Sequence, residues 1–175
     1  MIPELTRVVD ADYLSGIASA PIDEIRTMRS TCADLENGTS YVRRLAQGRL
    51  DLLAEETKQR ATGSGGSLGA LVDSLASTLS DGVRAPGSGR VDQELDPPDH
   101  VVAPLTEALD ARVSPAIVSS VADLGDDELS AAVVALQDFE EELSAARRSL
   151  HSTIDALNNE LARRIAAGES PAGLG

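Results

Sequence analysis

Two rows of polar residues, in distant parts of the chain, share both their residue types and their spacing. The rows are Glu36, Ser40, Arg43, Gln47 and Asp51, and Glu140, Ser144, Arg147, His151 and Asp155. Successive members of each row are four, three, four and four residues apart. Only Gln47 and His151 differ in type. This agreement indicates one binding chemistry that the chain presents twice.

The residue types of these rows suit a ligand that carries guanine and phosphate. An arginine fork binds phosphate oxygens or the O6 and N7 atoms of guanine. A carboxylate accepts hydrogen bonds from guanine N1–H and N2–H, and Ser, Gln or His side chains complete the contacts to phosphate or to a base edge. Because the row occurs twice, a symmetric ligand with two guanines and two phosphates matches it.

On an α-helix, this spacing places each row along one side. At about 100° per residue, the five side chains lie within a band of about 80° and extend over about 22 Å of helix. Each row begins one residue after an apolar heptad position, Leu35 in the first and Phe139 in the second. If the two helices are antiparallel, the rows therefore meet on one face and form a surface with approximate two-fold symmetry.

Two long helices that pair by their heptads, over residues 21–60 and 125–167, are predicted to carry the rows. Pro21 suits a first helical turn, and Gly125 or Asp126 suits a helix cap. The apolar positions alternate spacings of three and four, as in a coiled-coil seam. The seam residues are Ile25, Met28, Cys32, Leu35, Thr39, Val42, Ala46, Arg49 and Leu53 in the first helix, and Phe139, Leu143, Ala146, Leu150, Thr153 and Leu157 in the second.

The middle of the first seam is weakly apolar, because Thr39, Ala46 and Arg49 occupy seam positions. We therefore expect the pair to need support from other elements or from a bound molecule. Gly38 and Gly48 each cost about 1 kcal/mol of helix propensity relative to Ala. A closely approaching ligand or partner backbone would explain these glycines.

The rest of the chain is predicted to consist of shorter pieces. A short amphipathic helix is expected to bury one apolar stripe, either on a partner or back on the coiled coil. The stripe residues are Leu68, Leu71, Val72, Leu75 and Leu79. The predicted pieces are a partly ordered N-terminal segment 1–20, a flexible linker 61–67, the short helix 68–82, a flexible linker 84–100, short helical pieces within 104–124 and a tail 168–175.

Composition favours an all-α protein that acts by binding. Of 175 residues, three are aromatic (two Tyr, one Phe and no Trp), which suits long packed helices better than a β-sandwich. The net charge of −14 argues against direct DNA binding and favours a basic protein partner. No apolar run approaches the roughly 18 residues that cross a membrane, and no signal-peptide pattern is present, so a cytoplasmic protein without membrane contact is expected.

The sequence predicts no enzyme, metal site or catalytic cofactor. A single cysteine, Cys32, excludes an internal disulfide and a Cys-rich metal site and is expected to be a small seam residue. We find no phosphate-binding Gly-Lys loop, no His and carboxylate spacing for a metal, and no nucleophile with a plausible base.

The pattern E-x3-S-x2-R-x3-Q/H-x3-D resembles the signature of the RsiG family of actinobacterial anti-sigma factors. The segments PIDEIRTMRSTCADLENGTSYVRRLAQGRLD and DLGDDELSAAVVAL are also similar to that family. The resemblance implies an antiparallel coiled coil that binds cyclic di-GMP, as an intercalated pair of molecules, between itself and a WhiG-type sigma factor. The ligand-loaded protein would then hold the sigma factor away from RNA polymerase and repress its sporulation and developmental genes.

Carried over by position, the resemblance implies that Arg43, Asp51, Arg147 and Asp155 contact guanine and phosphate and that the other row residues support them. His151 departs from the family pattern. An imidazole can replace an amide as donor or acceptor, but its charge depends on pH, so the two halves need not bind equally.

An alternative hypothesis is a coiled-coil adaptor or scaffold that needs no nucleotide. Polar residues beside an apolar seam are common in coiled coils, where they form intrahelical ion pairs on a solvated flank. In that case the apolar helix 68–79 would dock a partner. A titration with cyclic di-GMP separates the two hypotheses.

Overall fold

The computed structural model describes residues 2–10, 12–62 and 97–169, and this part of the chain is helical without strands. The predicted all-α fold is confirmed. The short helix predicted over 68–82, with its apolar stripe, lies outside the described residues. The elements are α1 (Pro3–Val8), α2 (Ile22–Ala61), α4 (Asp99–Arg112), α5 (Pro115–Ser119), the 3-10 helix η1 (Val121–Asp123) and α6 (Asp126–Ala166).

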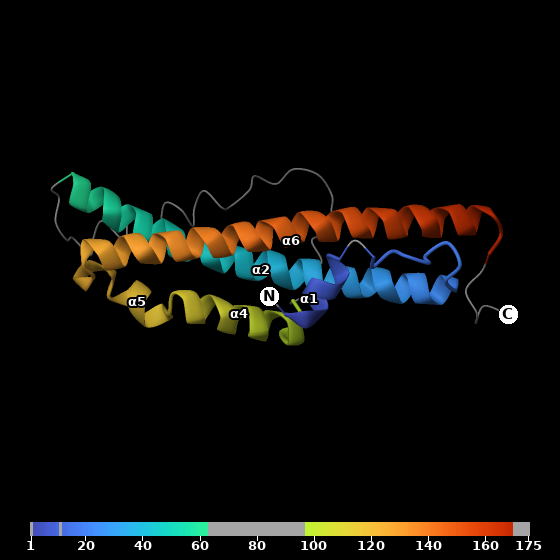
Figure 1. Cartoon of the computed structure of the whole chain (residues 1–175), viewed down its shortest axis with the longest axis horizontal. Coiled ribbons are helices and arrows are strands. Elements are labelled where there is room, and N and C mark those ends of the chain that lie inside the picture. Colours follow the sequence, from blue (N-terminus) through green and yellow to red (C-terminus); the bar gives the residue numbers. More distant parts are fainter. Residues whose placement is uncertain (1, 11, 63–96, 170–175) are drawn as a thin grey trace, which may run out of the picture.

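Helices α2 and α6 lie side by side and run antiparallel (Figure 1). Arg60, near the end of α2, donates a hydrogen bond to Asp126 at the start of α6. Arg164, near the end of α6, donates a hydrogen bond to the backbone of the segment that precedes α2. The predicted seam residues are buried, apart from the partly buried Met28 and Arg49. The predicted antiparallel pair of long helices is therefore confirmed, with its core between α2 and α6.

The ends of the long helices follow from local chemistry. Helix α2 begins after Pro21 and has Lys58 and Arg60 in its last turn, where cations interact favourably with the helix dipole. Helix α6 begins after Gly125, whose backbone N–H donates to the Glu128 carboxylate at 2.9 Å. That bond satisfies one backbone donor at the helix start.

A third helix, α4, packs against α2 and α6 along part of their length (Figure 1). It begins at Asp99, inside the stretch 84–100 that was predicted as a linker, and five residues before the predicted start at Pro104. Pro104 lies in the helix interior, where proline removes a backbone hydrogen bond. Burial of Val101, Leu105 and Leu109 on one side of α4 offsets that cost.

Helix α4 supplies the support that the weak seam of α2 requires. A Cβ at Gly38 would lie 2.5 Å from Cγ1 of Val101, so only a glycine lets α4 of the same chain approach α2 this closely. The prediction that a ligand or partner backbone explains Gly38 is therefore wrong. A Cβ at Gly48, in contrast, would have no atom within 4 Å outside its own stretch of helix. Arg49 donates to the Val113 carbonyl at 2.6 Å, which ties the end of α4 to the seam.

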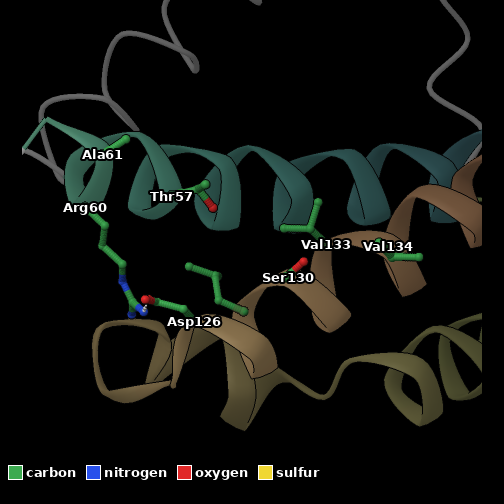
Figure 2. Close-up of a pocket in the computed structure, with 8 residues that line it drawn as sticks. Thr57, Arg60, Ala61, Asp126, Ser130, Val133 and Val134 are labelled. Atoms are coloured by element: carbon green, nitrogen blue, oxygen red, sulfur yellow. Dashed lines mark hydrogen bonds and ion pairs between the residues drawn. The ribbon is translucent and has the colours of Figure 1, made fainter.

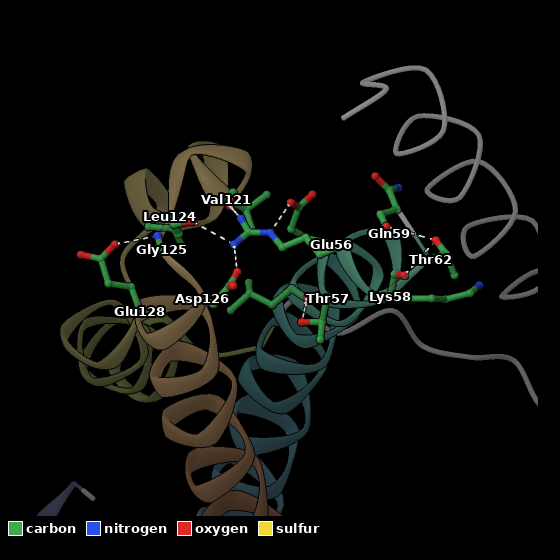
Figure 3. Close-up of polar contacts among 12 residues, drawn as sticks. Glu56, Thr57, Lys58, Gln59, Thr62, Val121, Leu124, Gly125, Asp126 and Glu128 are labelled. Atoms are coloured by element: carbon green, nitrogen blue, oxygen red, sulfur yellow. Dashed lines mark hydrogen bonds and ion pairs between the residues drawn. The ribbon is translucent and has the colours of Figure 1, made fainter. Parts of the chain in front are cut away.

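Two arginines fasten the ends of the helix pair. Arg60 donates to the carboxylates of Glu56 and Asp126 at 2.7 Å each and to two backbone carbonyls before α6, and Figure 3 shows these acceptors converging from α2 and from the turn. At the other end, Arg164 is buried and donates to the Ile17 carbonyl at 2.8 Å. The segment before α2 is therefore anchored to α6.

Candidate functional site

The two polar rows lie on the face of the α2–α6 pair that is turned away from α4. Gly38, which contacts α4, is two residues beyond Glu36 and thus about 200° around the helix from it. On α6, Glu142 is likewise two residues beyond Glu140, and its carboxylate lies 3.2 Å from Arg112 of α4. We call the side that carries the rows the ligand face, and the opposite side the α4 face.

The first half of the ligand face is organised around Glu36. Its Oε1 atom accepts a hydrogen bond from Ser40 Oγ at 2.8 Å, one helical turn along α2. The same oxygen accepts from Arg147 Nε of α6 at 2.9 Å, and His151 Nε2 lies 3.3 Å from it. One carboxylate therefore joins a serine of its own helix to an arginine and a histidine of the other.

The second half repeats this arrangement around Glu140. Its Oε1 atom accepts from Ser144 Oγ at 2.9 Å on its own helix. From α2 it accepts from Arg43 Nη1 at 3.0 Å and from Gln47 Nε2 at 3.2 Å. The two halves are thus related by an approximate two-fold axis between the helices, and the Gln and His positions of the rows are equivalent in space as well as in sequence.

The remaining row residues, Asp51 and Asp155, stay outside these two clusters. Both are exposed, and neither makes a hydrogen bond or an ion pair with another residue in the described part of the chain. Their carboxylates are therefore open to a bound molecule. Their predicted role in ligand binding stays a prediction.

The carboxylates at the centres of the two clusters are partly withdrawn from water. The Glu36 and Glu140 side chains are 21% and 22% exposed, so a solute can still reach them. Burial alone would raise the Glu36 pKa, but hydrogen bonds from Arg147 and Ser40 and the nearby His151 outweigh it and lower this pKa. In Glu140, burial is likewise outweighed, by Arg43, Ser144 and Gln47, so its pKa is also lowered.

Each arginine of the ligand face uses only part of its hydrogen-bonding capacity. Arg147 binds Glu36 through Nε, and Arg43 binds Glu140 through Nη1, so neither pair is the two-bond fork that arginine and a carboxylate can form. The Nε of Arg43 is buried without a hydrogen-bond partner, which is an unfavourable state for a donor. The arginines are therefore positioned by the glutamates and retain donors for another acceptor.

The sequence did not reveal which side of the pair is covered, because α4 was expected to begin later and its packing partner was not predicted. The one available signal in the sequence was Gly38 itself, a glycine inside a predicted helix, because such a glycine can admit a closely packed neighbour. Within the described ranges, no group of three or more His, Cys, Asp or Glu side chains is placed to hold a metal ion. In the same ranges, no helix is both long and apolar enough to cross a membrane.

The fold and the paired clusters define an α-helical coiled-coil protein, in which two equivalent polar clusters are built across an intramolecular helix pair. The model of the RsiG-like family matches residues 11–79 and 116–174, which is more than half of the chain and includes both rows. The chain belongs to the RsiG-like family. This membership supports an anti-sigma factor function, with a sigma factor as the general class of partner.

The two matched segments contain α2 and α6, whereas α4 lies in the stretch between them. No curated protein and no solved structure matches the chain.

Proposed function

We propose that this protein is a cytoplasmic anti-sigma factor that binds cyclic di-GMP through its paired motifs and sequesters a WhiG-type sigma factor. The regulated genes would be those for sporulation and development. The observation that carries the proposal is the approximate two-fold symmetry of the ligand face, where each glutamate joins its own serine to an arginine and a Gln or His of the opposite helix.

The ligand's chemistry fits this symmetry. Cyclic di-GMP has two guanines and two phosphates, and an intercalated pair of its molecules would present guanine and phosphate groups to both halves. Arg43 and Arg147 supply donors for phosphate oxygens or for guanine O6 and N7. The exposed carboxylates of Asp51 and Asp155 supply acceptors for guanine N1–H and N2–H. The ligand would be regulatory, and the protein would act by binding without catalysis.

Ligand binding would require the network to rearrange. In the described structure each arginine is neutralised by a glutamate of the other helix. A phosphate oxygen competes for the same N–H donors, because phosphate and carboxylate are both anionic acceptors. Bound cyclic di-GMP would then lie between the ligand face and the sigma factor, and the complex would keep the sigma factor from RNA polymerase.

A nucleotide-independent adaptor is the second candidate function. The observation in its favour is that both arginines already have carboxylate partners, so the ligand face is largely satisfied without any nucleotide. In that case the network would stabilise the helix pair, and a partner would bind regardless of cyclic di-GMP.

The test is a titration of the sigma factor into the purified protein with and without cyclic di-GMP, by isothermal calorimetry. We expect cyclic di-GMP to be required for tight binding, and Arg43→Ala plus Arg147→Ala to weaken it about 100-fold or more, since each lost charge-assisted hydrogen bond contributes about 1.5–3 kcal/mol. Equal sigma-factor binding without the nucleotide would establish the adaptor instead.

A matched control removes two arginines outside the network. Arg26 and Arg163 are exposed, and each pairs only with a carboxylate within its own helix. Arg26→Ala plus Arg163→Ala makes the same change in net charge and should leave the response to cyclic di-GMP within about twofold. An equal loss in both double variants would mean that overall charge, and not the network, governs binding.

A further inference from the structure

An apolar groove of about 420 Å³ lies between the last turns of α2 and the first turns of α6. Ser130 and Val133 of α6 line it from one side, and Thr57 and Ala61 of α2 line it from the other (Figure 2). The buried Leu129 also lines the groove. Val134, at its edge, is 52% exposed. A half-exposed valine beside an apolar groove indicates a surface that gains stability when something covers it.

The groove is a continuation of the ligand face. In a coiled coil, residues separated by whole heptads lie on the same side. Thr57 follows Glu36 by three heptads, and Val133 precedes Glu140 by one heptad. Ser130, which also lines the groove, precedes Ser144 by two heptads. The groove therefore lies on the same side of the helix pair as the polar network, and Thr57 is about 9 Å beyond Asp51, a distance of six helical residues.

The end of the groove is held in place by polar contacts. Arg60 binds Asp126 at 2.7 Å and the Leu124 carbonyl at 2.9 Å, so the end of α2 is joined to the turn before α6. The first turn of α6 is acidic and exposed, with Asp127 and Glu128 following Asp126. The groove thus combines an apolar floor with a negatively charged end.

We propose that the groove receives the apolar side of a helix from the sigma factor, with basic residues of that helix facing the acidic start of α6. This inference rests on the proposed function for its partner. A sigma factor that covers ligand on the network also lies over the same face of the helix pair, and the groove extends that face. Apolar burial in the groove adds affinity for the sigma factor. It also selects a partner whose shape and charge fit the groove, and the ligand alone cannot provide that selectivity.

The experiment substitutes Val134→Asp in the full chain and measures sigma-factor binding by calorimetry at saturating cyclic di-GMP. We expect binding to weaken about tenfold or more, because a valine that is buried at an interface is replaced by a charge that opposes burial. Val134→Leu should retain binding. As the matched control, Ile165→Asp changes a side chain that is 56% exposed at the far end of α6 and should leave affinity within about twofold.

Unchanged sigma-factor binding by Val134→Asp would overturn the inference. A fall in the melting temperature of the free Val134→Asp chain that disappears when residues 68–79 are deleted would assign the groove to that segment of the same chain. Concentration-dependent dimerisation of the wild type that Val134→Asp abolishes would assign it to a second copy. Either result would overturn a sigma-factor helix as the occupant.

The proposed function can fail separately. If the wild type binds the sigma factor equally well without cyclic di-GMP, the nucleotide-dependent mechanism is wrong, while the groove variant still tests docking. If the wild type does not bind the sigma factor under any condition, both the proposed function and the groove assignment are wrong.

Discussion

The two faces of the α2–α6 pair are built from the same helices but differ in how completely their side chains are satisfied. On the α4 face, Gly38 is in close contact with Val101, and Arg49 is bound by Asp110 and Val113. On the ligand face, the side chains at the centre of the network are polar and only partly exposed, and Arg43 has a buried donor without a partner. One face is covered by a third helix of the same chain, and the other is not covered by α4.

This difference explains how a weak coiled-coil seam can coexist with a polar face. The contact between α4 and the middle of α2 stabilises the helix pair on the α4 face, so apolar residues are not needed at the same level on the ligand face. Polar residues beside the seam are then compatible with a stable helix pair. The comparison predicts that mutations on the α4 face mainly change stability, whereas mutations on the ligand face mainly change binding and have smaller effects on stability.

The largest expected effect on stability comes from truncating the core of α4. Leu105 is fully buried. Leu105→Ala should lower the free energy of unfolding by about 2–5 kcal/mol, because it removes apolar contacts and leaves a cavity. Urea unfolding followed by circular dichroism measures this change. Cyclic di-GMP affinity at a temperature where the variant is folded should stay within about threefold, and a larger loss would show that the faces are not separable.

Replacing the two glycines of α2 by alanine should change the stability of the protein in opposite directions. Gly38→Ala should destabilise the protein by about 1–2 kcal/mol, because overpacking against Val101 exceeds the gain in helix propensity. Gly48→Ala should stabilise it by up to about 1 kcal/mol, because nothing lies near the added methyl group. Thermal unfolding of both variants measures the difference. Stabilisation by Gly38→Ala would mean that α4 moves aside at little cost.

A smaller effect concerns the one difference between the half-sites. His151→Gln makes the two motifs identical. We expect the variant to bind cyclic di-GMP within about threefold of the wild type, because Gln47 already makes the equivalent contact to Glu140 in the other half. Calorimetric titrations of the two proteins at one pH measure the difference. A loss of affinity larger than about tenfold would show that the two half-sites need different side chains at this position.

The smallest expected effect is the response of the network to acid. Because the Glu36 pKa is lowered in the folded state, its ionised form contributes stability above the ordinary glutamate range, and this contribution is lost as the pH falls through the lowered value. Unfolding free energy should therefore fall below about pH 4.3, the ordinary glutamate pKa. Glu36→Gln should flatten part of that fall in urea titrations. An unchanged slope in the variant would mean that other carboxylates dominate.

Local patterns accounted for much of the fold and for the composition of the candidate site. Heptad spacing identified the seam from Ile25 to Leu53, because coiled-coil packing repeats regularly along the chain. The start of α4 was missed, because Pro104 resembles a helix start and burial of Val101 is a tertiary effect. For the same reason Gly38 was assigned to an approaching ligand or partner backbone, although α4 occupies the space beside it.

The sequence by itself determined the helical class, the coiled-coil seams and the two matching rows, because these depend on residue type and on spacing along one helix. The tertiary structure decided which carboxylate holds which arginine, that Asp51 and Asp155 remain outside the clusters, and which face α4 covers. Those features depend on distances between helices that are far apart in the chain, and no periodicity within a single helix encodes such distances.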